Sequence, residues 1–522
     1  MSRTEQGVEM MTSEAHYMTR TSEVPERTFE VQGNVDYLAA VMVTPLNAWF
    51  RTSFELYSIL LIACLNATAS GFDSSIFSTI NAMDQYKAFF HQKETGSSTG
   101  IIFAIYTLGS LSGAVFTGPV LDLLGRGVGI GAGAVIIMTG AIVTTAARSE
   151  AYLLVGRLIL GLGIALGTSA APTYAIELAP PQWRARVTGY YNSFFYSGSI
   201  LATGVTYATA KISGSLSWRL PLTLQCIPPL FILAGSFCIP ESPRWLCSHG
   251  RFEEATKILA KHHGAGNANH PLVQLELREL REFTANQKMR AWWDWRELVQ
   301  THSARWRLLM VTLMSYGSQL SGNSCLTYYL PTIIVSCAGA LFGSATNDRF
   351  GRRTKLWIGS FALAGLFAAV TGISSQFASR QTAAEIGRDL SNAGVSMIFL
   401  FEFVYSFVYT PLTATYCAES LDNHTRATGM GIHVMMNNTA NFYNTYVTAV
   451  ALEAIAWKYY LVFVSLNVIY GFLWFFLGVE TRRRTLEELQ EVFEARWPPS
   501  ASLTKYSIIR VPNGQSDRTA TA

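Results

Sequence analysis

Long apolar stretches with almost no charge recur along the chain, and this pattern constrains the fold more than any other feature. They cover residues 56–83, 98–121, 127–147, 151–176, 187–210, 220–240, 308–347, 356–379, 392–418, 427–452 and 459–479. Asp73, Arg157 and Glu402 are the only charged residues within them. An α-helix needs about 20 apolar residues to cross a bilayer, and most of these stretches have about that length. The sequence therefore predicts an all-α membrane protein with many crossings.

The composition excludes several other classes of protein. Of the 522 residues, 50% are hydrophobic and 14% are charged, whereas soluble proteins carry about 25% charged residues. The net charge of +4 and the lack of a basic patch with interleaved aromatic residues argue against a nucleic-acid partner. The seven cysteines form no Cys-x-x-Cys pair, and no phosphate loop, metal-ligand cluster or nucleophile elbow occurs in the sequence. We therefore expect no cofactor, no metal and no enzymatic activity.

The sequence contains an internal repeat that divides the apolar stretches into two sets. The segment Asp122-Leu-Leu-Gly-Arg126 recurs as Asp348-Arg-Phe-Gly-Arg352. In each half a glutamate then precedes an arginine by seven residues, first at Glu177 and Arg184 and later at Glu419 and Arg426. Matching landmarks in two halves predict two parallel bundles around a central site. Each bundle is expected to hold six helices.

Charge in the loops sets the domain boundaries and the orientation. We expect an N-terminal tail over residues 1–53, an N-terminal six-helix bundle over 54–240, a helical loop over 241–306, a C-terminal bundle over 307–479 and a C-terminal tail over 480–522. Basic clusters lie in the central loop and beside alternate connections, so the positive-inside rule places the loop and both termini in the cytoplasm. The polar tails are expected to be poorly ordered.

The second half is short at its start. Leu56 to Leu121 supplies two helices and an outer loop in 66 residues, whereas Leu308 to Asn347 has only 40. Two helices of about 20 residues use all of these and leave none for a turn. Because basic residues flank both sides, an even number of crossings is still required. The sequence predicts a truncated eighth helix or an imperfect gene model, and two short kinked helices that turn near Pro331 are the alternative.

Short motifs at the ends of the apolar stretches identify a family resemblance. They are Gly118-Pro-Val-Leu-Asp122-Leu-Leu-Gly-Arg126, Gly156-Arg157, Glu177-Leu-Ala-Pro-Pro-Gln-Trp-Arg184, Pro240-Glu-Ser-Pro-Arg-Trp245, Asp348-Arg-Phe-Gly-Arg352 and Glu480-Thr481. In this order and spacing the chain resembles the sugar porters of the major facilitator superfamily, and within them the fungal lactose-permease-like and hexose transporter branch. The resemblance implies the major facilitator fold and import of a disaccharide or hexose by alternating access. It also implies a monomer in the plasma membrane, with a sugar, a proton and the lipid bilayer as its partners.

Asp73 and Arg157 are the two charges that the first half carries at membrane depth. A charged side chain in the bilayer is costly unless it is paired or functional. Desolvation favours the neutral acid and a nearby cation favours the carboxylate, so Asp73 could take up and release a proton. Gly71-Phe72-Asp73 and Gly156-Arg157 resemble the family motifs whose aspartate and arginine couple transport to protons. A structural buried ion pair, or a uniporter that keeps the pair, is the alternative.

The resemblance also implies a sugar site of amides and aromatic rings. Amide side chains both donate and accept hydrogen bonds, as sugar hydroxyls require. The candidates are Asn192, Gln319, Asn323, Asn437 and Asn441, with Phe72, Tyr328 and Tyr329 as aromatic walls. For any single asparagine, packing between helices is the competing interpretation. Asn192, Ser318 and Ala414 replace larger family residues, which favours a disaccharide over glucose. Glu402 has no family counterpart and is either a second protonatable group or a buried mismatch.

Charged residues at the helix ends form a candidate cytoplasmic gate. They are Asp122, Arg126, Glu177, Arg184, Glu241 and Arg244 in the first half, and Asp348, Arg352, Glu419, Arg426 and Glu480 in the second. The resemblance implies a network that joins the halves when the carrier faces outward, whereas solvated helix ends are the plainer interpretation. Two other functions stay open for the chain, a sugar sensor that does not transport and an inactive truncated carrier. The few residues that follow Glu480 argue against a sensor.

Overall fold

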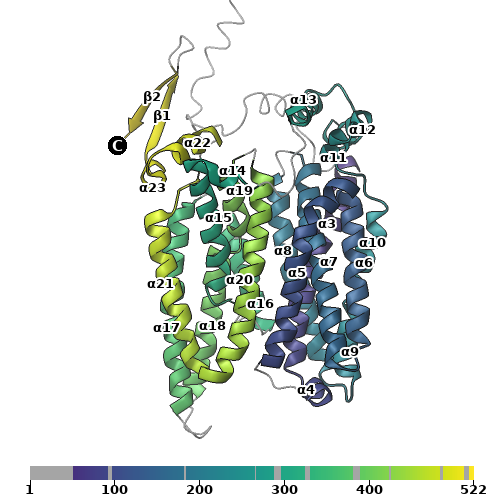
Figure 1. Ribbon diagram of the computed structural model, residues 1–522, viewed down its shortest axis with the longest axis vertical. Helices are drawn as coiled ribbons and strands as arrows, with labels where there is room; N and C mark the ends of the chain where they lie inside the picture. The colour runs from purple at the N-terminus through teal and green to yellow at the C-terminus, as the bar shows by residue number, and fades with distance from the viewer. Residues whose placement is uncertain are drawn as a thin grey trace, which may run out of the picture.

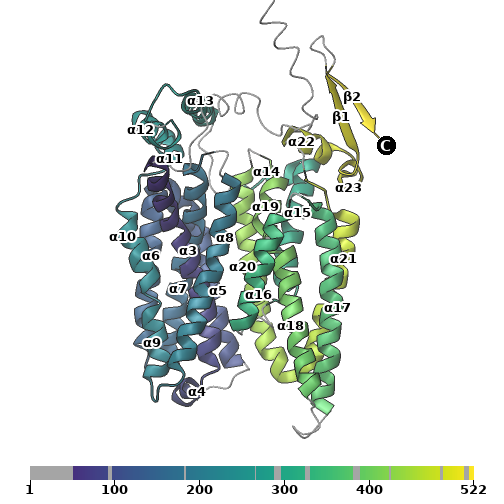
Figure 2. The same cartoon turned by 180° about the vertical axis from the view of Figure 1, so that it is seen from behind.

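The computed structural model describes residues 51–91, 97–180, 184–264, 266–286, 295–323, 330–347, 349–379, 388–422, 425–482, 486–510 and 516–521. These residues form two helical bundles that stand side by side with their helices roughly parallel (Figure 1). Short helices of the central loop and of the C-terminal tail lie at the same end of the molecule in both views (Figures 1 and 2). The two-bundle, all-helical fold expected from the apolar stretches is confirmed.

The first bundle contains the six crossings that the sequence predicts. They are α3 (Arg51–Asn81), α5 (Ser97–Leu124), α6 (Arg126–Thr145), α7 (Glu150–Leu178), α8 (Arg184–Thr209) and the pair α9 (Leu216–Leu224) and α10 (Ile227–Ser236), with the short α4 (Asp84–Phe90) after α3. The sixth crossing is interrupted before Pro228 and Pro229, where proline removes two backbone donors. Glycine allows α6 to pack closely on α7. A Cβ on Gly140 would lie only 2.7 Å from the backbone nitrogen of Leu160, which is too close for a side chain to fit without a shift of the helices.

The second bundle repeats this arrangement with one short member. Its crossings are α15 (His302–Leu320), α16 (Leu330–Ala345), α17 (Arg352–Ser379), the pair α18 (Arg388–Val408) and α19 (Thr413–Ser420), α20 (Arg426–Ile455) and, after the 3₁₀ turn η3 (Ala456–Tyr459), α21 (Tyr460–Leu477). The bundles meet where α5 packs on α20 and where α8 packs on α16. The two contacts are equivalent, because α5 and α16 are the second crossings of their bundles and α8 and α20 are the fifth.

The eighth crossing, α16, has the fewest described residues among the crossings that are a single helix. These 16 residues span about 24 Å at about 1.5 Å per residue, and the helix begins at the edge of the described part of the chain. Residues 324–329 lie outside the described part of the chain. The origin of the short helix, a truncated transporter or an imperfect gene model, therefore stays a prediction.

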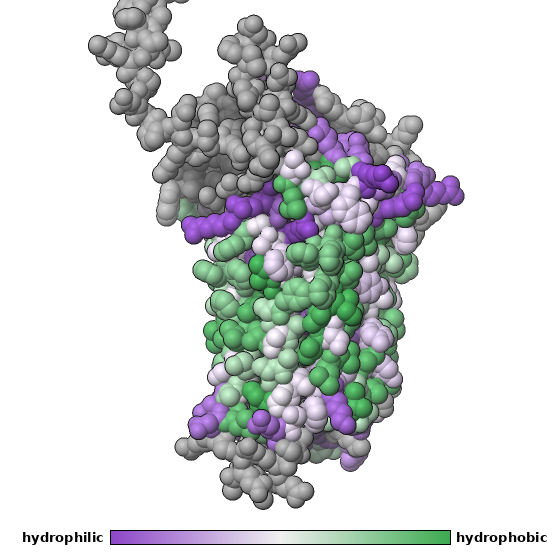
Figure 3. All heavy atoms as spheres, turned by 90° about the vertical axis from the view of Figure 1, so that its left-hand side faces the viewer, coloured by the Kyte–Doolittle hydropathy of each residue, from purple (hydrophilic) through white to green (hydrophobic). Residues whose placement is uncertain are grey.

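The outer surface of the bundles is apolar over most of their height. Figure 3 shows hydrophobic side chains over the middle of one face, with hydrophilic residues gathered toward both ends. Among the described residues, Phe116, Tyr207 and Phe237 are large hydrophobic side chains that stay 62%, 69% and 83% exposed. Among the residues that the structure describes, eight helical spans are long and apolar enough to cross a membrane, and three of them join two consecutive helices. The chain is thus a multi-pass membrane protein whose outward residues face lipid.

The central loop and the tail carry structure of their own. The loop forms α11 (Pro243–Ser248), α12 (Phe252–His263), α13 (Pro271–Asn286) and α14 (Glu297–Gln300). The tail forms α22 (Leu486–Glu494), α23 (Pro498–Ala501) and an antiparallel hairpin of β1 (Lys505–Arg510) and β2 (Ser516–Thr521). The expectation of a poorly ordered tail is wrong for α22 and α23. Leu489 and Phe493 of α22 are buried, and the guanidinium carbon of Arg307 on α15 lies 4.7 Å from the centre of the Phe493 ring.

Candidate functional site

Asp73 is buried in the first bundle, and its partner is a residue that the sequence did not single out. The aspartate lies in the second half of α3 and is 1% exposed. Its Oδ1 accepts a hydrogen bond from the Gln225 amide, which sits at the break between α9 and α10. Its Oδ2 has no hydrogen-bond partner among the described residues. Gln225 is also 1% exposed. It is the only amide side chain in the apolar stretch 220–240, and that isolation was the signal that could have identified it.

Arg157 is held by aromatic rings instead of by the aspartate. Its guanidinium carbon lies 4.1 Å from the centre of the Phe77 ring on α3 and 4.5 Å from that of Tyr106 on α5. Such contacts are worth about 2 kcal/mol where water is excluded, and Arg157 is only 3% exposed. Both side chains are described, and no ion pair or hydrogen bond joins Arg157 to Asp73. The expected direct pair is therefore absent, and the guanidinium contacts the Phe77 and Tyr106 rings in its place.

Amide side chains of α15 and α20 form a hydrogen-bonded cluster in the second bundle. Gln319 Nε2 donates to Asn437 Oδ1 at 3.0 Å, and Ser318 Oγ donates to the same oxygen at 3.4 Å. Asn444 Nδ2 donates to the Gln319 backbone oxygen at 2.9 Å. Gln319 and Asn437 are half-buried, whereas Asn444 is buried. The half-buried amides can exchange these mutual bonds for bonds to a ligand.

The other predicted sugar contacts are placed separately. Asn441 Oδ1 accepts from Thr445 at 3.2 Å on its own helix, and Asn192 on α8 and Asn323 after α15 are half-buried. Phe72 is 4% exposed and packs in the apolar cluster of Ile76, Phe77 and Trp218, so in this structure it belongs to the core of the first bundle. Tyr328 and Tyr329 lie outside the described residues.

Charged residues at the loop end of the first bundle form one connected group. Arg126 Nε lies 3.2 Å from Glu177 Oε2 and Arg126 Nη1 lies 3.4 Å from Asp122 Oδ1. The Glu241 carboxylate accepts from the backbone N–H groups of Arg126 at 2.8 Å, Gly127 at 3.1 Å and Ser242 at 2.9 Å. Ser242 Oγ donates to Glu177 Oε2 at 2.5 Å. The first two backbone groups begin α6, so Glu241 caps that helix.

The second bundle builds the same group from the repeated motif. Arg352 Nη2 lies 3.2 Å from Glu419 Oε1, and Thr481 Oγ1 donates to Glu419 Oε2 at 2.6 Å. Glu480 accepts from the backbone N–H groups of Arg352 at 2.8 Å and Arg353 at 3.2 Å, which begin α17. Ser242 and Thr481 were missed by the sequence reasoning, although each directly follows a landmark glutamate.

The remaining gate candidates are Arg244, Arg426, Arg184 and Asp348. Arg244 is exposed, and Arg426 Nη2 donates to the Leu421 backbone oxygen at 3.5 Å. The Arg184 side chain and Asp348 lie outside the described residues. The ion pairs described above each join residues of one half, so the network between the halves stays a prediction.

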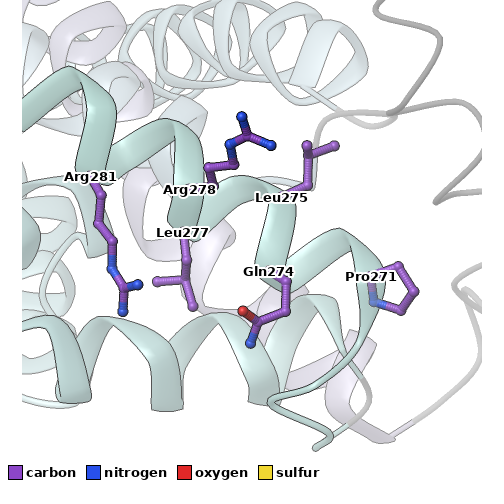
Figure 4. A pocket seen from close by; sticks show the side chains of 6 residues that line it. All are labelled: Pro271, Gln274, Leu275, Leu277, Arg278 and Arg281. Carbon is purple, nitrogen blue, oxygen red and sulfur yellow. The ribbon is translucent and has the colours of Figure 1, made fainter.

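A pocket of about 510 Å³ lies away from these groups, on the central loop. It is lined by α13, with Gln274, Leu275, Arg278 and Arg281 among its residues (Figure 4). The described residues contain no group of histidine, cysteine and acidic side chains that could hold a metal ion.

Comparison with known proteins gives one family. The model of the family described as "Sugar (and other) transporter" matches residues 59–339 and 332–493. The high-affinity glucose transporter of Kluyveromyces lactis is 29% identical over 484 residues, which cover 85% of this chain and 86% of that protein. The MFS-type transporter criB of Aspergillus cristatus is 28% identical, over 83% of this chain and 92% of that protein.

Solved structures agree with the fold. The inward-open xylose transporter XylE from E. coli superposes with a TM-score of 0.70 at 20% identity, over 84% of this chain and 99% of that one. The proton:xylose symporter XylE bound to 6-bromo-6-deoxy-D-glucose gives a TM-score of 0.67 at 19% identity, over 85% of this chain and 100% of that one.

Proposed function

Since the chain belongs to the sugar (and other) transporter family of the major facilitator superfamily, we propose that it imports a sugar together with a proton by alternating access. The single observation that carries the proton coupling is the burial of Asp73 at membrane depth. An intramembrane carboxylate is costly to maintain without a function. The plasma membrane, with the central loop and both tails in the cytoplasm, is the proposed location.

Asp73 is the proposed proton carrier and Gln225 keeps it hydrogen-bonded. An amide can donate to the carboxylate or accept from the neutral acid, so the aspartate has a partner before and after a proton binds. Arg157 is held beside α3 by the Phe77 ring. Loss of the negative charge on Asp73 weakens its attraction to the guanidinium, which links protonation to the packing of α3, α5 and α7.

The amide cluster of α15 and α20 is the proposed sugar site. Gln319 and Asn437 present donors and acceptors together, and Asn192 contributes from the first bundle. Relatives named as glucose transporters favour a hexose, whereas the smaller groups at Asn192, Ser318 and Ala414 favour a disaccharide. The capped helix ends around Glu241 and Glu480 are the proposed cytoplasmic gate.

Uptake by Asp73→Asn in sealed vesicles tests proton coupling. With glucose and lactose as labelled substrates, we expect the variant to exchange sugar but not to accumulate it against a gradient. Asp84→Asn is the matched control, because Asp84 is an exposed aspartate of α4 in a surface ion pair with Lys87. Accumulation by Asp73→Asn that still collapses with the proton gradient refutes the assignment to Asp73.

An inactive truncated carrier is the second candidate, and two observations favour it. The stretch from Leu308 to Asn347 has only 40 residues, and the family model matches in two pieces that overlap at residues 332–339, within α16. A version with about 25 residues restored after Pro331 matches the spacing of the first half. Uptake by the restored form alone supports truncation, whereas uptake by the chain as it stands excludes it.

A further inference from the structure

Glu402 is a buried carboxyl group that the proposed transport cycle does not use. It lies in α18 of the second bundle and is 1% exposed. Its Oε2 accepts a hydrogen bond of 2.9 Å from Ser336 Oγ on α16, and Ser336 is itself 2% exposed. A serine hydroxyl can donate to a carboxylate or accept from a carboxylic acid, so this partner suits both protonation states.

Close backbone packing fixes the position of Ser336 relative to Glu402. A Cβ on Gly339 would lie 2.6 Å from the Phe403 backbone oxygen, and one on Gly343 would lie 2.5 Å from that of Phe407. Helix α16 therefore cannot shift along or away from α18 without losing these contacts. The Ser336–Glu402 hydrogen bond therefore depends on the relative position of α16 and α18.

The same helices form one of the two contacts between the bundles. Tyr196 of α8 packs with Ile333 and Ala340 of α16. Its hydroxyl lies 3.5 Å from Ser406 Oγ on α18 and 3.4 Å from Thr410 Oγ1, which follows the end of that helix. Ser406 follows Glu402 at an interval of four residues, so the two share one face of α18. Glu402 thus lies one helical turn from the hydrogen bonds that join the halves.

Several titratable groups surround Glu402. Tyr196 of α8 and Tyr405 of α18 lie within its electrostatic reach, and Cys337 of α16 follows Ser336 directly. From α17, Lys355 places its ammonium 3.0 Å from the Gly343 backbone oxygen and 2.8 Å from Asn347 Oδ1. Of these, Tyr196 and Tyr405 interact electrostatically with the carboxyl, whereas the Lys355 ammonium lies at the C-terminal end of α16.

We propose that Glu402 is a second proton-binding site, separate from Asp73, that is protonated while the α8–α16–α18 contact is closed and ionised when that contact opens to water. The proposal rests on the alternating access proposed above. In the closed contact the carboxyl is desolvated, which favours the neutral acid, and opening restores hydration of the carboxylate. The step is the binding of one proton to one carboxylate oxygen, and no other bond is formed or broken.

Infrared difference spectroscopy on the full-length chain in lipid nanodiscs tests this directly, with pH change as the only stimulus and no sugar required. Within a pH range in which exposed glutamates stay ionised, we expect Glu402→Gln to remove one titrating carboxylic-acid C=O band, while the exposed control Glu453→Gln leaves that band in place. Asp73→Asn must leave the Glu402 band in place, which separates the two sites. A spectrum of Glu402→Gln that keeps every band of the wild type overturns the proposal.

Ser336→Ala keeps the inference falsifiable if Glu402→Gln does not fold. This variant retains the carboxyl group but removes its hydroxyl partner, so the same band is expected to persist at a shifted frequency. A band of unchanged frequency in Ser336→Ala refutes the assignment to Glu402. Neither infrared measurement involves transport. The proposal for Glu402 and the proposed coupling through Asp73 can therefore fail independently of each other.

Discussion

Replacing Glu241 with glutamine removes one charge from a site where three backbone N–H groups converge. A hydrogen bond to a charged group contributes about 1.5–3 kcal/mol and a neutral one about 0.5–1.5 kcal/mol, so each bond loses about 1 kcal/mol. The site is half-buried, and solvent screening reduces the sum over the Arg126, Gly127 and Ser242 bonds from about 3 to about 2 kcal/mol. Glu241→Gln is therefore expected to destabilise the first bundle by about 2 kcal/mol.

The repeat supplies an internal check on this value. Glu480 receives the N–H groups that begin α17, so Glu480→Gln is expected to cost a similar amount in the second bundle. The two sites lie in different bundles and share no partner, so their effects should add to within about 0.5 kcal/mol in the double variant. A difference of more than about 0.5 kcal/mol between the two single variants would show that the two caps are not equivalent.

Thermal unfolding in detergent measures the effect. For a unit of about 150–250 residues, a loss of about 2 kcal/mol lowers the midpoint by about 4–8 °C. Glu254→Gln is the matched control, because Glu254 forms a surface pair with Arg251 at 2.6 Å and both side chains are half exposed. Such pairs contribute about 0–1 kcal/mol. A midpoint for Glu241→Gln no lower than that of Glu254→Gln would refute the capping argument.

Four further substitutions probe other contacts. Gly125→Ala should lower the midpoint more than Gly351→Ala, since a Cβ crowds a capping glutamate at both positions but only Gly125 has a positive φ, of 96°; equal midpoints would contradict this. Arg157→Lys should reduce uptake at least about tenfold, because an ammonium cannot stack between two rings as a planar guanidinium does; wild-type rates would show that the stacking is dispensable. Glu276→Gln should speed amide hydrogen exchange in α12 and α13, since its carboxylate lies 2.5 Å from His263 Nδ1 in the buried contact that holds the loop on α7; unchanged exchange would exclude that role. Asn437→Ala should raise the KM for sugar more than it lowers the maximal rate, and the opposite split would place Asn437 outside the binding site.

The sequence by itself determined the class of fold and its internal symmetry. Apolar stretches of membrane length are local properties of the chain, and they mark the helices of both bundles without reference to any contact. The repeated Asp-x-x-Gly-Arg segments likewise predicted two equivalent halves, which the matching environments of Arg126 and Arg352 bear out. The short start of the second half was also visible as a count of residues.

Only the tertiary structure decided which buried groups meet. Their position within long apolar stretches shows that Asp73 and Arg157 lie at membrane depth. The rotation of each helix about its axis decides what each side chain faces. That rotation brings Gln225 to Asp73, two aromatic rings to Arg157 and Ser336 to Glu402. It is fixed by close contacts between helices, many of them at glycines, and such contacts join residues that are distant in the sequence and leave no local pattern in it.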